Sequence, residues 1–146
     1  MRILAINPGS TTTKIAVYEN ENRLFVKTFY HSSDDLAPFH TIISQYDYRK
    51  DLIVSELRKE NLFSGFAAIV GRGGLLKPIS SGVYEVNERM KSDLRNALMQ
   101  HACNLGGLLA EEISLLIPGC KAYIADPVVV DELDDDNTIS ADKSDP

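Results

Sequence analysis

Residues 7–14, NPGSTTTK, hold the densest group of side chains suited to chemistry. A Pro-Gly turn, four consecutive hydroxyls and a lysine stand between two apolar runs that predict strands. Such a turn directs backbone N–H groups and hydroxyl donors into one concavity, as a phosphate needs, and Lys14 adds a point charge. It is not a Walker A loop, because the second glycine of GxxxxGK[ST] is absent and a strand follows Lys14. The alternative is an ordinary hydroxyl-rich hairpin turn with a solvated lysine.

Two further candidates follow predicted strands. Arg72 stands in the glycine segment 71–74, where the backbone can approach a ligand and the planar guanidinium suits a carboxylate or phosphate. The segment fails GxGxxG, so no dinucleotide site follows, and a glycine turn with a surface arginine is the alternative. Asp126 lies at the rim where α/β folds keep functional carboxylates, and it could orient a reacting group or hold Mg²⁺, directly or through water. Its alternative role is to open a turn before Pro127.

The histidines and cysteines carry weaker signals. His101 lies between two predicted helices, where it is either a base or substrate contact or a hydrogen-bonded structural histidine. We expect His31 and His40 at the surface, and no two histidines have the spacing of metal ligands. Cys103 and Cys120 have neither metal nor redox spacing, so we expect reduced packing residues.

The formal net charge of −6 is concentrated at the C-terminal end. Residues 131–146 carry seven acidic side chains and one lysine, which leaves residues 1–130 with 14 charges of each sign. Binding to nucleic acid or to an anionic membrane would favour a basic excess or a one-sided basic block. Neither is present, so we expect neither partner.

Other classes are excluded by local patterns. The acidic end fails as a calcium-binding EF-hand because Ile139 stands where the loop requires glycine, and we expect a solvated, poorly ordered end. Apolar runs reach only five or six residues, too few for a membrane helix. The N-terminal apolar run is too short for a signal peptide, so we expect a cytoplasmic protein.

Hydrophobic patterning predicts the elements that position these groups. Three strands, over residues 2–6, 14–18 and 23–30, predict an antiparallel meander with a polar turn at 19–22. Further strands are expected at 66–70 and 121–125, and helices from residue 87 and over 104–117.

A helix in two pieces is expected between the third and fourth strands, ending near residue 61. Ser32, Ser33 and Asp34 are its candidate N-caps, and Pro38 fits its first turn. The order βββαβααβ indicates an α/β domain whose mixed sheet joins an antiparallel meander to parallel strands.

Five segments, in this order and spacing, together resemble the first half of the butyrate kinase branch of the acetokinase family. They are INPGSTTTKIAVYE (6–19), VGRGGLLKPI (70–79), GVYEVNERM (82–90), HACNLGG (101–107) and DPVVVDEL (126–133). The family belongs to the actin-like, sugar-kinase and Hsp70 ATPase superfamily, in which two ribonuclease-H-like domains enclose the active site. The resemblance therefore implies a ribonuclease-H-like domain.

The resemblance also implies an activity, with ATP and Mg²⁺ as cofactors. Butyrate and ATP would be converted reversibly to butyryl phosphate and ADP. The site residues it implies are Asn7, Ser10, Thr12 and Lys14 facing the transferring phosphoryl group, Arg72 binding carboxylate or phosphoryl oxygens, Asp126 positioning the carboxylate or Mg²⁺, and His101 and Asn104 supporting the cleft.

Members of the family are more than twice as long as this chain. The resemblance therefore implies an N-terminal domain over residues 1–130, a truncated acidic end over 131–146, and a partner that is a separately encoded second half or another copy. We expect little or no turnover by the chain alone. The alternatives are a non-catalytic remnant, or a phosphate- or carboxylate-binding half that pairs with another protein. A different member of the superfamily is a third, which GRGGLLKP and DPVVVDEL argue against.

Overall fold

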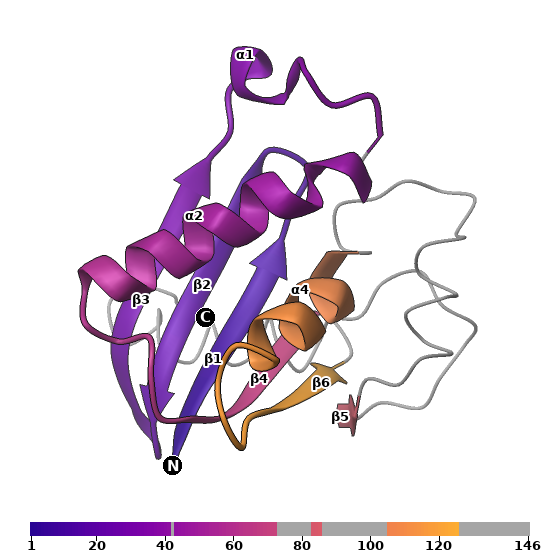
Figure 1. The fold of residues 1–146 in the computed structure, drawn as a ribbon. Coiled ribbons are helices and arrows are strands. Elements are labelled where there is room, and N and C mark those ends of the chain that lie inside the picture. Colours follow the sequence, from indigo (N-terminus) through magenta and orange to yellow (C-terminus); the bar gives the residue numbers. More distant parts are fainter. Residues whose placement is uncertain (42, 73–82, 86–104, 126–146) are drawn as a thin grey trace, which may run out of the picture.

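In the part of the chain that the structure describes, the fold is built on one six-stranded mixed sheet. The computed structural model describes residues 1–41, 43–72, 83–85 and 105–125 (Figure 1). The strands are β1 (Arg2–Pro8), β2 (Thr12–Glu19), β3 (Asn22–Tyr30), β4 (Phe66–Arg72), β5 (Val83–Glu85) and β6 (Lys121–Ala125). The helices are α1 (Ser33–Leu36), the 3₁₀ helix η1 (Ile43–Gln45), α2 (Tyr46–Lys59) and α4 (Leu105–Ser114). The spatial order of the strands is β3-β2-β1-β4-β6-β5.

The strand pairing confirms the predicted mixture of antiparallel and parallel strands. The first three strands form an antiparallel meander, β4 and β6 extend the sheet in parallel with β1, and β5 is antiparallel to β6. The polar turn between β2 and β3 is also confirmed. Asn20 adopts φ 56° there, a left-handed conformation that asparagine tolerates better than most residues.

The first hairpin is longer than predicted. The sequence placed Thr12 and Thr13 in a turn, but β2 already begins at Thr12, and Pro8 pairs with Thr13. Backbone pairing does not depend on side-chain polarity, so the ladder continues through polar residues until the chain must reverse. The turn is therefore reduced to residues 9–11.

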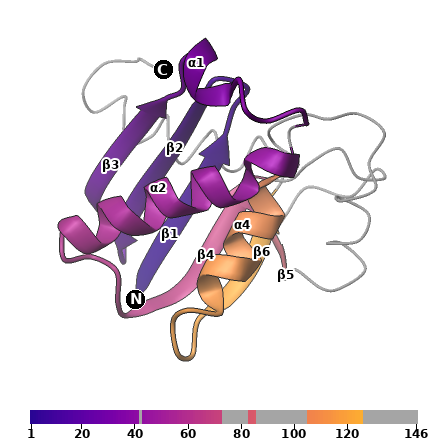
Figure 2. The ribbon, with the colours of Figure 1, turned by 45° about the horizontal axis from the view of Figure 1, so that its top comes forward.

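Helices α2 and α4 cover the same face of the sheet (Figures 1 and 2). Alternate strand residues point to that face, as the two-residue period of a strand requires. The main core comprises Leu4, Ile6, Ile15, Val17, Ile69 and Ile124 from the sheet, Ile53 and Leu57 from α2, and Leu105, Leu108, Leu109 and Ile113 from α4. A separate cluster of Ala5, Ala16 and Tyr18 lies on the opposite face of the sheet, which we call the open face.

The predicted helix between β3 and β4 does form in separate pieces. Ser32 caps α1, accepting from the Asp35 N–H while the Asp35 carboxylate accepts from the Ser32 N–H. The position given to Pro38 was wrong: α1 is a single turn whose C-cap is Ala37, so the proline follows the helix. The second piece, α2, ends close to the predicted residue.

The third predicted helix pairs closely with the sheet. Gly106 in α4 lies against Gly71 in β4, and a Cβ built on either glycine would overlap backbone atoms of the other element. Packing against α4 therefore requires the first glycine of the GRGG segment.

Several predictions concern residues outside the described ranges. The helix from residue 87, the domain boundary at 130 and the acidic end all fall there. In the described part of the chain, no helix has the length and apolarity needed to span a membrane. Cys120 is a free, half-buried thiol, as expected.

Candidate functional site

The sheet brings three of the predicted site residues to one place. Asn7 is the last residue but one of β1, Lys14 is its cross-strand partner on β2, and Arg72 ends the neighbouring parallel strand β4. An Arg72 Nη1 donates to Asn7 Oδ1 at 3.4 Å, across 65 positions of sequence. By strand alternation all three side chains belong to the open face, with Ala5 and Ala16. An amide, an ammonium and a guanidinium therefore converge at one sheet edge.

The turn that follows β1 completes this group. The Gly9 N–H donates to the Thr12 carbonyl at 2.7 Å, and a Cβ on Gly9 would lie 2.7 Å from the Thr12 hydroxyl, so any larger residue would displace the Thr12 side chain. Ser10 and Thr11 are exposed in this turn, and Thr12 shares the strand face of Lys14. Three of the four hydroxyls thus lie beside the predicted phosphate position. The fourth, Thr13, is fully buried on the α2 side.

Arg49 is the functional candidate that the sequence prediction missed. It projects from α2, is fully buried, and donates from Nη1 to the Thr12 carbonyl (2.9 Å) and the Thr13 hydroxyl (3.1 Å) and from Nη2 to the Ser10 carbonyl (3.2 Å). Gln45 Oε1 accepts from Nε and from Nη2. Burial lowers the pKa of the guanidinium to about 10, so it stays charged at neutral pH.

A signal for Arg49 was present in the helical spacing. Arg49, Ile53 and Leu57 recur every four residues and are the buried residues of α2. An arginine in register with an apolar stripe must either be buried with partners or interrupt the core. Here the hydroxyl-rich turn supplies the partners.

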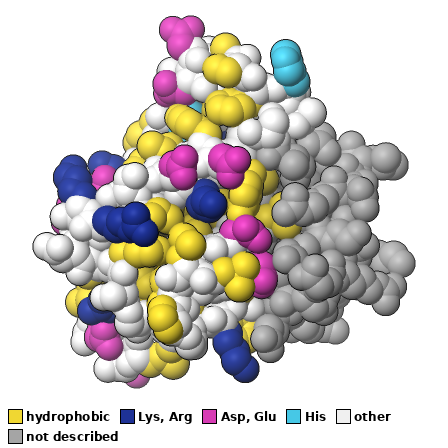
Figure 3. Space-filling view, in the orientation of Figure 1, with side chains coloured by type: hydrophobic (Ala, Val, Ile, Leu, Met, Phe, Trp, Pro, Cys, Tyr) yellow, Lys and Arg dark blue, Asp and Glu magenta, His cyan; other side chains and the backbone are white. Residues whose placement is uncertain are grey.

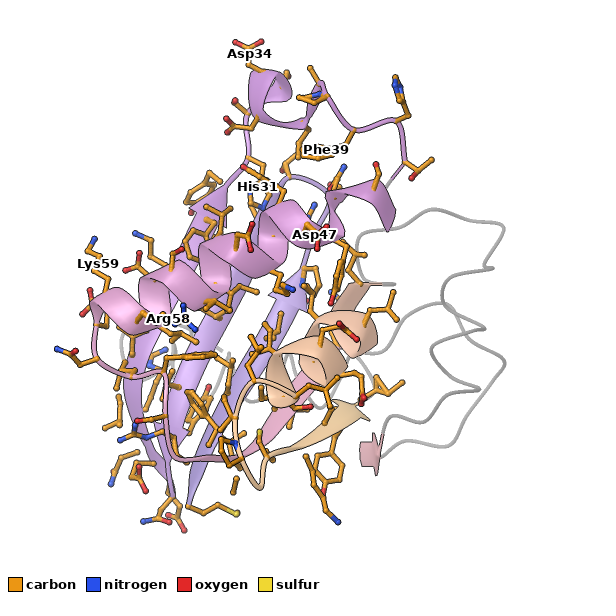
Figure 4. The ribbon with its side chains drawn as sticks, viewed as in Figure 1. His31, Asp34, Phe39, Asp47, Arg58 and Lys59 are labelled. Carbon is orange, nitrogen blue, oxygen red and sulfur yellow. The ribbon has the colours of Figure 1, made fainter. Side chains whose placement is uncertain are left out.

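His31 is a second buried polar group, and its predicted surface position was wrong. The side chain is 5% exposed, with Nε2 2.8 Å from the Thr13 hydroxyl and Nδ1 3.2 Å from the Tyr48 hydroxyl. Each ring nitrogen of His31 therefore has a hydroxyl partner, and the Thr13 hydroxyl also accepts from Arg49 Nη1. His40, by contrast, is exposed as expected. Figure 4 shows His31 beside α2.

We expect the stability of the chain to fall as the pH drops below about 6.5, the ordinary pKa of histidine. Burial, and next the charge of Arg49, lower the pKa of folded His31, whereas Asp35 acts in the opposite direction. The unfolded chain therefore binds the proton first, which favours unfolding between the two pKa values. Urea unfolding of the wild type and of His31→Gln between pH 5 and 7.5 checks this.

His31→Gln should have the shallower pH slope of unfolding free energy, because its titrating group is gone. His40→Gln, which removes an exposed imidazole, is the comparison variant. Equal slopes for the wild type and His31→Gln would contradict the effect.

The face covered by the helices does not carry this site. Acidic, basic and hydrophobic side chains are all exposed on that face (Figure 3). Among the described residues, no group of three or more histidine, cysteine, aspartate or glutamate side chains is placed to hold a metal. The nitrogen donors of Lys14 and Arg72, on the open face of the sheet, suit anionic oxygens.

The remaining predicted site residues lie outside the described ranges: Asp126, His101 and Asn104. The last described residue before Asp126 is Ala125, which ends β6 and is the register partner of Arg72.

Comparison with known proteins finds relatives that are named butyrate kinase. No protein-family model matches it. It is 53% identical over 140 residues to the probable butyrate kinase of Bacteroides thetaiotaomicron, covering 96% of this chain and 40% of that protein. Butyrate kinase 1 of Clostridium acetobutylicum is 50% identical over 141 residues, covering 95% of this chain and 39% of that protein. This chain is homologous to the N-terminal part of butyrate kinases.

The chain spans about 40% of the length of the butyrate kinases it matches. Two solved structures share its fold at low identity. The acetate kinase of Entamoeba histolytica has a TM-score of 0.52 at 13% identity, covering 86% of this chain and 34% of that one. An exopolyphosphatase of Cytophaga hutchinsonii has a TM-score of 0.54 at 14% identity, covering 90% and 57%. The predicted ribonuclease-H-like α/β fold is confirmed.

Proposed function

We propose that this chain supplies the N-terminal part of an enzyme that transfers a phosphoryl group reversibly between ATP and butyrate, giving butyryl phosphate and ADP. The supporting observation is the convergence of Asn7, Lys14 and Arg72 at one sheet edge in a chain about half identical to butyrate kinases. The reaction also needs the part of these enzymes that this chain does not match. We place it in the cytoplasm, where ATP is available.

The geometry suits phosphoryl transfer to a carboxylate. Such a transfer depends on positioning and charge neutralisation, and a carboxylate is already a nucleophile, so it needs no general base. Arg72 would hold carboxylate or phosphoryl oxygens with its fork, and Asn7 would orient that fork through the Oδ1 contact. Lys14 and the hydroxyls of Ser10 and Thr12 would contact the transferring phosphoryl group.

The roles of the residues outside the described ranges follow the family resemblance. Asp126 would position the carboxylate or hold Mg²⁺, directly or through water, and His101 and Asn104 would support the cleft. Mg²⁺ bound there would neutralise charge on the phosphate oxygens. Asparagine and hydroxyl oxygens at the described edge are compatible with a hydrated Mg²⁺, which usually needs only one or two protein carboxylates.

We expect the 146-residue chain alone to show little or no turnover, because one half of a cleft cannot exclude water from the reacting groups. A hybrid enzyme, in which this chain replaces the matching N-terminal part of the Bacteroides thetaiotaomicron relative, should be active. Acyl phosphate trapped with hydroxylamine, in the presence of butyrate, ATP and Mg²⁺, measures both.

The intact relative assayed in parallel is the control. Robust turnover by the chain alone would overturn the need for a second part. A folded hybrid that binds ATP but forms no butyryl phosphate would favour a non-catalytic, phosphate- or carboxylate-binding role.

A further inference from the structure

The turn between β1 and β2 has its backbone acceptors bound from inside the protein. Arg49 donates to the carbonyls of Ser10 and Thr12, and the His31 N–H donates to the carbonyl of Thr11 at 2.8 Å. Carbonyl oxygens repel a phosphate, so a turn that is to bind one must direct them elsewhere. Three successive carbonyls are held in this way, two of them by one side chain.

All three nitrogens of the Arg49 guanidinium donate hydrogen bonds within this arrangement. Its Nη1 and Nη2 contact the turn, and Gln45, one helical turn earlier, fixes Nε and Nη2. Among the described residues, no carboxylate lies within 4 Å of the guanidinium. Burying a charge is costly unless an opposite charge lies near it. The described part of the protein places no such charge beside the Arg49 guanidinium. An anion bound on the outer side of the turn would supply the missing balance.

We propose that Arg49 is a positioning residue for the phosphate site. Its fork holds the carbonyls of Ser10 and Thr12 away from the ligand and sets the hydroxyl-bearing turn in the conformation that receives a phosphate chain. Lysine keeps the charge but has no planar fork, so it cannot hold two separate carbonyls in the same way. The inference rests on the proposed function in taking a phosphoryl group as the ligand of the turn.

Titration of the 146-residue chain with sodium tripolyphosphate, followed by the NMR amide shifts of residues 10–14, tests this. Tripolyphosphate carries the anionic chain of ATP without its base or sugar. We expect the wild type to respond, and Arg49→Lys and Arg49→Met each to raise the dissociation constant at least tenfold. Arg58→Met is the matched control: Arg58 lies on the same helix but is exposed, its guanidinium 5.1 Å from the Phe63 ring (Figure 4), and binding should stay within about twofold of wild type.

The two Arg49 variants separate the positioning of the turn from the effect of charge alone. If Arg49→Lys binds tripolyphosphate as tightly as the wild type, the charge of residue 49 is sufficient and the proposal is wrong. The proposal is also wrong if both variants bind like the wild type, or if the amide signals of the wild-type turn do not respond to tripolyphosphate. The amide signals of β1 and β4 show whether each variant is folded, and if Arg49→Met unfolds, the comparison of Arg49→Lys with the wild type is the test.

The kinase function is measured separately, in the hybrid enzyme with Arg49 intact. If the hybrid is inactive but tripolyphosphate binding depends on Arg49, the proposed kinase function is rejected and the positioning role is kept. If the hybrid is active but tripolyphosphate binding does not depend on Arg49, the kinase function is kept and the positioning role is rejected.

Discussion

Replacing Arg72 with alanine in the hybrid enzyme should lower kcat for butyryl phosphate formation by about 10³-fold. The guanidinium stands at the carboxyl end of β4, with Asn7 Oδ1 as a fixed partner at 3.4 Å, and so is oriented before substrate arrives. A pre-oriented donor stabilises charge on the transferring phosphoryl group without reorganisation. Arg72→Lys should restore little of the rate, because an ammonium cannot make two parallel contacts.

Arg2→Ala is the matched control for Arg72. Arg2 is an arginine of the same sheet, at the opposite end of β1, where it pairs with Glu19 and donates to the Ser64 carbonyl. Its loss removes the same charge far from the site, so kcat should stay within about twofold of the parent hybrid. Hydroxylamine trapping and thermal unfolding of each variant separate activity from folding. Near-normal kcat in a folded Arg72→Ala enzyme would remove Arg72 from the site.

Local sequence signals predicted the elements of the fold well. The three strands of the meander, the Ser32 cap, the end of α2 and the start of α4 each depend on neighbours in sequence, through alternation, capping or helical spacing, whereas α4 ends at Ser114, three residues before the predicted end. The predicted position of Pro38 in a first helical turn was wrong because α1 ends after one turn, and no local sequence rule predicts so early an end. The extension of β2 to Thr12 depends on cross-strand pairing with β1, which residue types do not reveal.

The site residues, too, could be predicted where local sequence signals mark them and not where tertiary contacts define them. Asn7, Lys14 and Arg72 were found because their residue types stand out beside glycine and strand ends, and the sheet then joins them. Arg49 and His31 were missed because each is defined by tertiary partners that converge on Thr13. A polar residue at the end of a strand looks exposed until such partners are known, and an arginine on an apolar helix stripe indicates burial without showing what its partners are. The roles of Asp126, His101 and Asn104 stay predictions.

Replacing Gly106 with alanine should lower the free energy of unfolding of the chain by about 2 kcal/mol, because inserting atoms into a full core costs about 1–3 kcal/mol and overlap with backbone atoms puts this position at the upper end. Alanine favours a helix over glycine by about 1 kcal/mol, so the loss is what remains after that gain. The new methyl group would overlap the carbonyl of Arg72, and α4 would have to move away from β4. Because that carbonyl belongs to the residue that carries the guanidinium, kcat of the hybrid should also fall, by about tenfold or more.

Gly65→Ala provides the comparison for this steric effect. Gly65 has φ 73° and nothing within 4 Å of a built Cβ, so alanine there meets only the backbone strain of a left-handed residue, about 1–2 kcal/mol, and leaves the site unchanged. Urea unfolding of both variants and the kcat of both hybrids make the comparison. Activity lost with Gly106→Ala but kept with Gly65→Ala would show that the contact between α4 and β4 sets the position of Arg72. If both variants were equally stable and active, the two glycine backbones would not need their close approach, and Arg72 would be held by its side-chain partners alone.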